Sequence, residues 1–413
     1  MDANSQNADV IDVVTKIKEH VDQSLKNKVG GSYSYIIGNN GLGKSRILRE
    51  LADSYENNFE SPVTTILCVT NTLYDRFDIG RNKQKIKYLG ARNATNAVFH
   101  TAIDRALARY ILTGIVETSR FMERFSQAVE VEISLRMPGV LRPDRANLAA
   151  HVDMRKLKGV SVQKHLGIEN LEVVEAVLNT TVKFRGLTKA KAKALLAFID
   201  LNPDVAVLVR KKAYIIDFPF FELSSGEKNK ILTAAKVLSH ARNHCLILLD
   251  EPETSLHLHW QRTFHSSLVE MLDGINHFHV IVATHSPIII SECAHLKNVE
   301  VVTLNDVMEK MSDGIQPGLR SVFSEATGID SYDEVMLDMF KTAPKNTKSV
   351  HERVTDILMD SVDRKLGALD GKAQLKELLS TEGITKAGRV LVQRAIRVLT
   401  DAQFEALCDE IPS

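Results

Sequence analysis

The segment of this chain best suited to chemistry is a glycine-rich octapeptide, Gly38-Asn39-Asn40-Gly41-Leu42-Gly43-Lys44-Ser45. It fits the phosphate-binding pattern G-x-x-x-x-G-K-[ST] at every fixed position. The glycines let the backbone curl around a phosphate with its N–H groups pointing inward. We then expect Lys44 to reach the β- and γ-phosphates and the Ser45 hydroxyl to ligate Mg²⁺. The alternative is a chance glycine-rich turn, which a strand before the loop and a helix after it would disfavour.

An acidic pair follows an apolar run later in the chain. Leu246–Leu249 predicts a strand that ends in Asp250 and Glu251. Carboxylates at such a strand end can hold the Mg²⁺ shell, the role expected of Asp250, and polarise an attacking water, the role expected of Glu251. Solvated carboxylates are the plain alternative, and the phosphate loop in the same chain weighs against it.

Two further features are informative only beside these motifs. The segment Leu223-Ser224-Ser225-Gly226-Glu227 stands before a helix predicted at Glu227–Ser239. A hydroxyl and free N–H groups at a helix start can bind an anion, although the segment read alone is only a good helix start with a Ser N-cap. His285 follows a strand predicted at His279–Thr284 and can hydrogen-bond a γ-phosphate or the attacking water. A lone histidine there is more often merely structural.

The four motifs GNNGLGKS, LSSGE, LLLDEPETSLH and ATHSP together resemble an ABC-type P-loop ATPase of the non-transporter branch. That branch includes the SMC-like repair ATPases, the OLD-like nucleases and AAA ATPases of bacterial anti-phage systems such as Septu and PARIS. The resemblance covers residues 30–104 and 213–290. It implies ATP and Mg²⁺ as cofactors, catalytic roles for Glu251, His285 and Lys44, and Mg²⁺ contacts for Ser45 and Asp250. The residues expected to hold the nucleotide are Asn39, Asn40, Gly41, Leu42, Gly43, Lys44, Ser45, Arg46, Ser224, Ser225, Gly226 and Glu227.

Three departures from the family pattern stand out. The family usually begins with antiparallel strands, whereas helical spacing predicts a helix at about residues 9–26 here. The lid glutamine expected after the second strand is absent; Asn71 stands in its place and Gln84 is the next candidate, so the lid residue stays open. OLD nucleases carry a C-terminal metal nuclease domain with a D-x-D pair, and this sequence has no D-x-D.

The pattern of apolar residues predicts an α/β fold with a P-loop head built on a mostly parallel sheet. We expect an N-terminal helix at 1–29, the two parts of the ATPase head at 30–104 and 211–315, a mainly helical insertion at 105–210 and a helical C-terminal unit at 316–413. The expected strands are Ser32–Ile37, Thr64–Val69, Ala213–Asp217, Cys245–Leu249 and Val280–Ala283 in the head, with Val129–Leu135 in the insertion. The insertion lacks sustained heptads, so long coiled-coil arms are not expected.

The composition predicts a cytoplasmic protein without a membrane partner. The 413 residues are 44 % apolar and 25 % charged with zero formal net charge, so no global field favours nucleic acid or an anionic membrane. No apolar run approaches the ~20 residues of a membrane span, and the first residues lack a secretory signal. The four separate cysteines are expected to be reduced thiols.

One local charge bias is large enough to suggest a partner. The basic stretch Lys183–Lys212 can contact nucleic-acid phosphates. A solvated helix face is an equal alternative, since lysine and alanine alternate from Lys189.

These observations predict an ATPase that converts ATP and water to ADP and phosphate, slowly or when stimulated by a partner. We expect it to pair head-to-tail with a second copy of itself. The first hypothesis is an anti-phage defence ATPase that regulates a separate effector, a nuclease or a toxin. The second is a DNA repair or recombination ATPase acting directly on nucleic acid. A transporter subunit is disfavoured by the DEPETSLH turn and by the insertion. The sequence leaves the effector, the trigger and the stoichiometry open.

Overall fold

The structure is a computed structural model. It describes residues 3–27, 30–71, 76–77, 83–90, 100–118, 120–138, 152–157, 160–212, 214–254, 256–293, 296, 298–311, 314–326, 332–343 and 347–399. The chain divides into two units, Met1–Tyr35 with Gly43–Thr284, and Ile36–Leu42 with His285–Ser413. The division therefore falls after Tyr35, after Leu42 inside the glycine-rich loop, and again after Thr284.

The main sheet has seven strands in the order β11-β10-β1-β9-β8-β2-β3. Within the first unit, β2 pairs in parallel with β3 and β8, and β8 pairs in parallel with β9. All six residues of β8 are buried, which explains why its sequence is a continuous apolar run. The α/β class and the mostly parallel sheet predicted from the sequence are confirmed. The strands are β1 Gly31–Ile37, β2 Thr65–Thr70, β3 Ile86–Leu89, β8 Cys245–Asp250, β9 Phe278–Ala283, β10 Val299–Met311 and β11 Gly314–Glu325.

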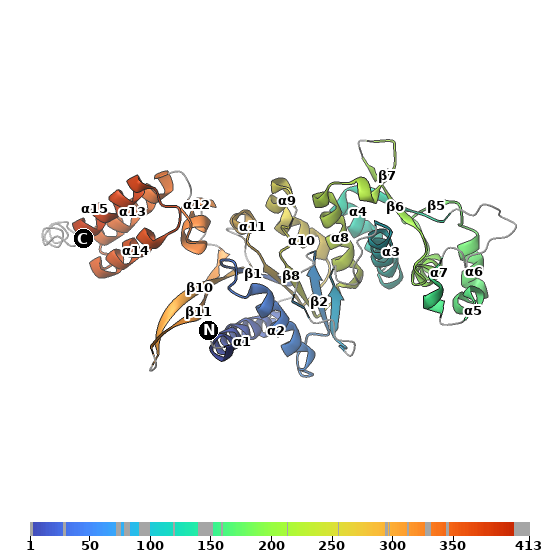
Figure 1. Cartoon of the computed structure of the whole chain (residues 1–413), viewed down its shortest axis with the longest axis horizontal. Helices are drawn as coiled ribbons and strands as arrows, with labels where there is room; N and C mark the ends of the chain where they lie inside the picture. The colour runs from blue at the N-terminus through green and yellow to red at the C-terminus, as the bar shows by residue number, and fades with distance from the viewer. Residues whose placement is uncertain are drawn as a thin grey trace. The chain divides into compact units, whose positions relative to one another are not determined.

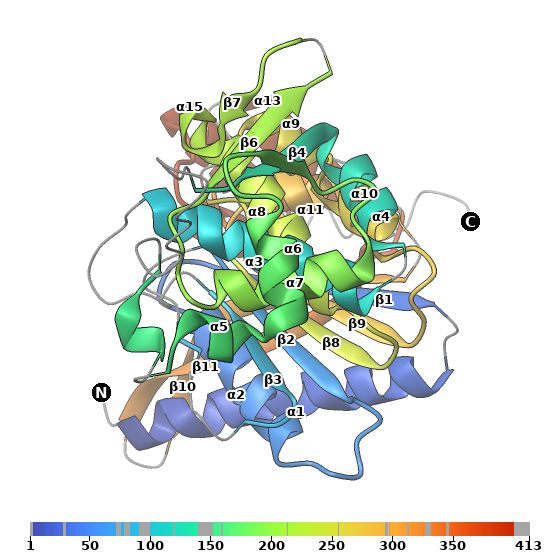
Figure 2. The same cartoon turned by 90° about the vertical axis from the view of Figure 1, so that its right-hand side faces the viewer.

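Helices of the first unit pack on the strands of the same unit (Figures 1 and 2). Helix α1, Ala3–Asn27, packs against α2, Lys44–Glu56, and against β9. Its buried residues Val10, Val13, Ile17 and Val21 recur at helical spacing, which is why one face of α1 turns inward. Helix α8, Ser225–His240, packs on β2, α3 and α4. The other helices are α3 His100–Glu117, α4 Phe121–Val129, α9 Leu258–Arg262 and α10 Phe264–Leu272.

Beside its helices, the insertion contains a second sheet of order β5-β4-β6-β7. The strand predicted at Val129–Leu135 corresponds to β4, whereas β5 and β6 were not predicted. Strand β4 pairs antiparallel with β6 although about seventy residues separate them in sequence, and the Asp104 carboxylate of α3 accepts a hydrogen bond from the Val207 N–H of β6. Such non-local pairing leaves little local signal in the sequence. The elements are β4 Val131–Arg136, 3₁₀ turn Met154–Leu157, α5 Val162–Leu166, α6 Ile168–Glu175, β5 Thr181–Lys183, α7 Lys189–Ile199, β6 Ala206–Lys211, β7 Phe218–Pro219 and 3₁₀ turn Phe220–Glu222.

The strand predicted at Ala213–Asp217 is wrong. Ala213 lies outside the described residues, and Tyr214–Asp217 forms an exposed bend. The strand lies earlier, at β6, where Val207, Leu208 and Val209 are buried. The apolar composition of the run at Tyr214 predicted a strand, but the side chains of Tyr214, Ile215 and Ile216 are exposed to solvent.

The second unit begins with α11, Pro287–Cys293, and a long β10–β11 hairpin in which Glu300 pairs with Glu325 and Met311 with Gly314. The prediction of a helical C-terminal unit from residue 316 is wrong for its first residues, since Gly314–Glu325 is the returning strand of that hairpin. Helices follow, as predicted, and share one core that includes Val350, Leu375 and Val392. They are α12 Tyr332–Glu334, π-helix Val335–Met339, α13 Thr347–Val362, α14 Ala368–Ser380 and α15 Lys386–Val398.

Within the described ranges, none of the helices combines the length and the apolar content needed to cross a bilayer. Cys68, Cys245 and Cys293 are buried, and burial raises the pKa of Cys245 to about 11. Cys408 lies outside the described residues.

Candidate functional site

Three parallel strands of the first unit end at the same level, and the candidate site lies there. Thr70 of β2 pairs with Asp250 of β8, and Asp250 pairs with Ala283 of β9. Asp250 is therefore flanked on both sides by strand ends. The carboxyl edge of a parallel sheet is the place where ligands bind in open α/β folds.

The central contact joins the phosphate loop to this edge. The Ser45 hydroxyl, in the first turn of α2, donates a hydrogen bond to Oδ1 of Asp250 over 3.0 Å. Asp250 is buried, with 4 % of its surface exposed. Ser45 and Asp250, which belong to separate motifs and are both predicted to bind Mg²⁺, are thus neighbours in space.

The loop geometry leaves the start of α2 open to an anion. Gly41 and Gly43 have φ values of +89° and +85°, which side chains other than glycine rarely tolerate. Gly43 is the N-cap of α2 and offers no side chain to cap it. The N–H groups of the first turn have no partner inside the helix, and the helix dipole adds positive potential. A phosphate is the ligand that fits this arrangement.

Lys44 is a buried cation at the same helix start, with 5 % of its surface exposed. Burial lowers the pKa of Lys44 to about 8, while the nearby charges of Glu251, Glu253 and Asp250 oppose that shift. At neutral pH the ammonium group is thus mostly charged, and a bound polyphosphate would favour the charged form further. Glu253 is not among the predicted site residues, although it stands in the same DEPET run.

Glu251 holds an unusual backbone conformation. Its φ is +48°, and its N–H donates to the Ala283 carbonyl over 2.9 Å, which fixes the residue against the end of β9. A positive φ in a residue other than glycine is seldom adopted without a structural reason. The conformation directs the chain sharply away from the sheet directly after Asp250, and leaves Glu251 half-buried at the edge.

The signature segment forms a well-defined helix start, two residues earlier than the predicted start at Glu227. Ser224 is the N-cap of α8, and with Glu227 it forms a reciprocal capping box. Glu227 also pairs with the Lys211 ammonium over 2.5 Å. Although burial opposes it, the hydrogen bonds from Lys211 and Ser224 lower the pKa of the Glu227 carboxyl. Ser225 is exposed and Gly226 is buried in the first turn.

Helix α8 is tied to the strand ends through polar contacts that the motifs do not reveal. Asn71, directly after β2, donates to the Thr233 hydroxyl over 2.9 Å and accepts from the Lys236 ammonium over 2.9 Å. Lys236 also donates to the Thr70 carbonyl over 2.8 Å. The side chain at the lid position is thus held by α8, while the other lid candidate, Gln84, is exposed.

A second connection runs from α8 to the turn that follows Glu251. Asn229 donates its side-chain N–H to the Thr254 carbonyl over 2.8 Å, and the Thr254 N–H donates to the Glu251 carbonyl. The helix that begins with the signature segment therefore contacts both β2 and the acidic turn. The sequence shows Asn229 only as one polar residue in a helix.

The oxygen ligands at the site suit a nucleotide-bound Mg²⁺ better than a metal ion coordinated only by protein side chains. Ser45 and Asp250 offer a hydroxyl and a carboxylate oxygen, which are hard ligands. Among the described residues no group of three or more His, Cys, Asp or Glu side chains gathers for a metal. Mg²⁺ typically takes one or two protein oxygens together with substrate phosphates, so the pair fits a nucleotide-bound ion.

The remaining predicted residues are distributed over both units. Asn39, Asn40, Gly41 and Leu42 belong to the second unit, as does half-buried His285. A Cβ on Gly38 would lie 2.8 Å from the Leu304 carbonyl oxygen, so β10 requires glycine at the start of the loop. Arg46 lies in the first turn of α2. The nucleotide contacts of these residues stay predictions.

Residues 204–291 match a family described as "AAA domain, putative AbiEii toxin, Type IV TA system". The matched range runs from the start of β6 into α11 and holds the signature segment, Asp250, Glu251 and His285, whereas the phosphate loop lies outside it. No curated protein matches this chain. The matched range, the mostly parallel sheet and the phosphate-loop geometry together support a P-loop nucleotide-binding domain of the AAA ATPase kind.

Proposed function

We propose that this chain binds and hydrolyses ATP with Mg²⁺ as an ABC-type ATPase. The observation that carries the proposal is the 3.0 Å hydrogen bond between Ser45 and Asp250, beside buried Lys44 and at the carboxyl edge of the sheet. A hydroxyl, a carboxylate and an ammonium group at the start of a helix are the groups that a magnesium triphosphate needs.

Each residue has a separate role in the proposed reaction. Lys44 binds the β- and γ-phosphates, while Ser45 and Asp250 hold the metal that neutralises phosphate charge. Glu251 orients the attacking water and accepts its proton. His285 is proposed to contact the γ-phosphate or that water.

The proposed activity includes pairing of two copies. Ser224 and Glu227 satisfy each other in the capping box. In the described part of the chain, the exposed Ser225 hydroxyl makes no hydrogen bond, so it is available to a ligand. We propose that Ser225 and Gly226 of one copy bind the γ-phosphate of ATP held by the other, giving a head-to-tail pair with two buried nucleotides.

We propose that pairing regulates a separate effector, a nuclease or a toxin, in anti-phage defence in the cytoplasm. The support is the resemblance of the motifs and the family description, which names a toxin and a toxin–antitoxin system. A second candidate, a DNA repair or recombination ATPase, is favoured by a cluster of basic residues on the insertion, among them Lys183, Arg185 and Lys212.

The test of pairing uses a variant that binds ATP without turnover, Glu251→Gln, with and without Ser225→Arg. Small-angle scattering or sedimentation measures the association state in ATP·Mg²⁺ and in ADP·Mg²⁺. The proposal expects a pair for Glu251→Gln in ATP, weaker association in ADP, and monomers when Ser225→Arg is added although ATP still binds. An association state that changes neither with the nucleotide nor with Ser225→Arg would contradict the proposed pairing.

A further inference from the structure

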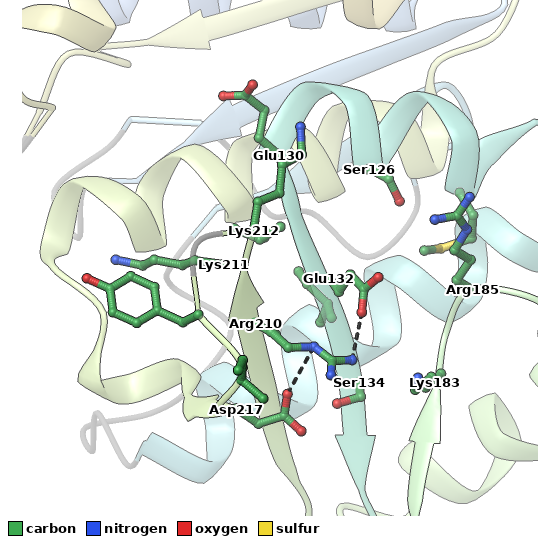
Figure 3. A pocket seen from close by; sticks show the side chains of 15 residues that line it. Ser126, Glu130, Glu132, Ser134, Lys183, Arg185, Arg210, Lys211, Lys212 and Asp217 are labelled. Atoms are coloured by element: carbon green, nitrogen blue, oxygen red, sulfur yellow. Dashed lines mark hydrogen bonds and ion pairs between the residues drawn. The ribbon is translucent and has the colours of Figure 1, made fainter.

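The insertion carries a cleft that the ATPase chemistry does not use. It has a volume of about 700 Å³ and opens over the face of the antiparallel sheet, beside α4 (Figure 3). We call it the sheet cleft. It lies wholly within the first unit. Its lining residues are Met122, Ser126, Glu130, Val131, Glu132, Ile133, Ser134, Lys183, Arg185, Arg210, Lys211, Lys212, Tyr214, Ile215 and Asp217.

The charges in the sheet cleft are unevenly balanced. Five of its side chains are basic and three are acidic. Two of the acids, Glu132 and Asp217, contact the same guanidinium group, that of Arg210, over 2.7 and 3.6 Å (Figure 3). Lys211 is paired with Glu227 outside the cleft. These contacts pair Arg210 and Lys211 but not the other three cations, and the third acid, Glu130, is exposed.

Three cations of the sheet cleft are left for an external anion. Lys183, Arg185 and Lys212 are exposed, and across the described ranges they form no ion pair or side-chain hydrogen bond. They come from two strands of the sheet and the residues just after them, β5 and β6, so their positions are set by strand pairing. Unpaired cations grouped along a hollow surface favour an extended polyanion.

An aromatic side chain completes the lining. Tyr214 is 55 % exposed. Its ring packs edge-on against the ring of Phe218, with 5.5 Å between the ring centroids. Beside it, Ile215 is 93 % exposed. Exposed apolar side chains that are grouped on a surface often mark an interaction site. Cations together with an exposed aromatic ring are the features by which proteins bind unpaired bases and their phosphates.

We infer that the sheet cleft binds single-stranded nucleic acid, with phosphates at Lys183, Arg185 and Lys212 and a base against Tyr214. A duplex would leave Tyr214 unused, because its bases are stacked inside. An acidic protein segment would use the cations but has no base to stack on the ring. The site is separate from the phosphate loop, so the inference does not depend on ATP hydrolysis.

The basic stretch seen in the sequence divides in the structure, and this division supplies a matched control. Lys183, Arg185 and Lys212 line the sheet cleft, whereas Lys189, Lys191 and Lys193 are exposed on α7 and do not line it. Replacing either set of three by serine removes the same charge from the same insertion. Only the position of the lost charge differs.

The experiment uses fluorescence anisotropy, in the absence of ATP and ADP, to measure binding of a labelled oligothymidylate. Its length of about 12 nucleotides lies within the site sizes of single-strand binders. The triple serine variant of Lys183, Arg185 and Lys212 should bind about tenfold or more weakly with a shallower salt dependence. The α7 triple variant should bind within about twofold of the wild type, because its charges lie outside the cleft. Tyr214→Ala should weaken binding about tenfold, and Tyr214→Phe should restore it. Circular dichroism checks that each variant is folded.

Several results would overturn the inference. One is the absence of detectable binding at low salt by the folded wild type. Another is an equal loss in both triple variants, which would indicate a diffuse surface effect. A third is heparin, duplex DNA or an acidic peptide binding as tightly as the oligonucleotide while Tyr214→Ala changes nothing, since the cleft would then bind polyanions or proteins instead.

Discussion

The Ser45 hydroxyl and the Asp250 carboxylate lie 3.0 Å apart although 205 positions separate them in the chain. Ser45 is placed by the start of α2, and Asp250 by the end of β8. Parallel pairing of β8 with β2 and β9 places Asp250 level with the ends of both neighbouring strands. The contact is thus a product of the whole βαβ arrangement rather than of either motif.

This contact predicts that Ser45→Ala makes ATP binding insensitive to magnesium. The wild type should bind ATP more weakly in EDTA than in Mg²⁺, because the metal links the phosphates to Ser45 and Asp250. In Ser45→Ala the two affinities should converge, as measured by calorimetry. Ser54→Ala is the matched control, since Ser54 lies on the same helix and donates only to the Leu51 carbonyl. A Mg²⁺ effect of wild-type size in Ser45→Ala would remove Ser45 from the metal site.

The capping box predicts a stability effect at the signature segment. Ser224→Ala removes the side chain that accepts from the Glu227 N–H and should reduce the free energy of unfolding by about 1 kcal/mol. Ser225→Ala should change it little, since that hydroxyl is exposed in the first turn. Urea unfolding of the two variants makes the comparison. If Ser225→Ala costs more stability than Ser224→Ala, the assignment of the cap is wrong.

A buried histidine predicts how stability changes with pH. His265 is 7 % exposed, its Nδ1 is hydrogen-bonded to the Tyr35 hydroxyl over 2.8 Å, and burial lowers its pKa from 6.5 to about 4. Because the unfolded chain takes up this proton first, the stabilisation is present above pH 6.5 and is lost as the pH falls toward 4. The loss from this group between pH 7 and pH 5 should be about 2 kcal/mol.

The measurement is urea unfolding at pH 7 and pH 5 for the wild type, His265→Gln and the exposed-site control His259→Gln. His265→Gln should be less stable at pH 7 but should lose about 2 kcal/mol less than the wild type on acidification. His259→Gln should follow the wild type. Equal pH dependence in all three proteins would show that His265 titrates normally in the fold.

The motif residues and the parallel core of the fold were predictable because their signals are local. The glycine-rich loop, the apolar strand before Asp250 and the Ser-capped helix each depend on fewer than about ten neighbouring residues. Strands β2, β8 and β9 are buried on both faces and so appear as apolar runs. The α/β class followed from their alternation with helices.

Several features that escaped prediction leave little signal in the sequence. The β4–β6 pairing joins strands about seventy residues apart, whereas the β10–β11 hairpin joins consecutive segments of the chain that were not predicted as strands. The exposed residues Ile215 and Ile216 belong to an apolar run that does not form a strand. Asn71 and Asn229 contact α8 and the acidic turn through side chains whose type alone does not reveal a partner.

The most direct test of the ATPase assignment compares binding and turnover in two variants. Lys44→Ala removes the buried cation at the phosphate loop, and Glu251→Gln keeps the size and polarity of the side chain but cannot accept a proton from water. Titration with labelled ATP and a phosphate-release assay are made on the same wild-type and variant samples. We expect Lys44→Ala to lose both binding and turnover, and Glu251→Gln to bind ATP normally but to release phosphate at least about a hundredfold more slowly. Unchanged ATP affinity in Lys44→Ala, or a wild-type rate of hydrolysis in Glu251→Gln, would contradict the ATPase assignment.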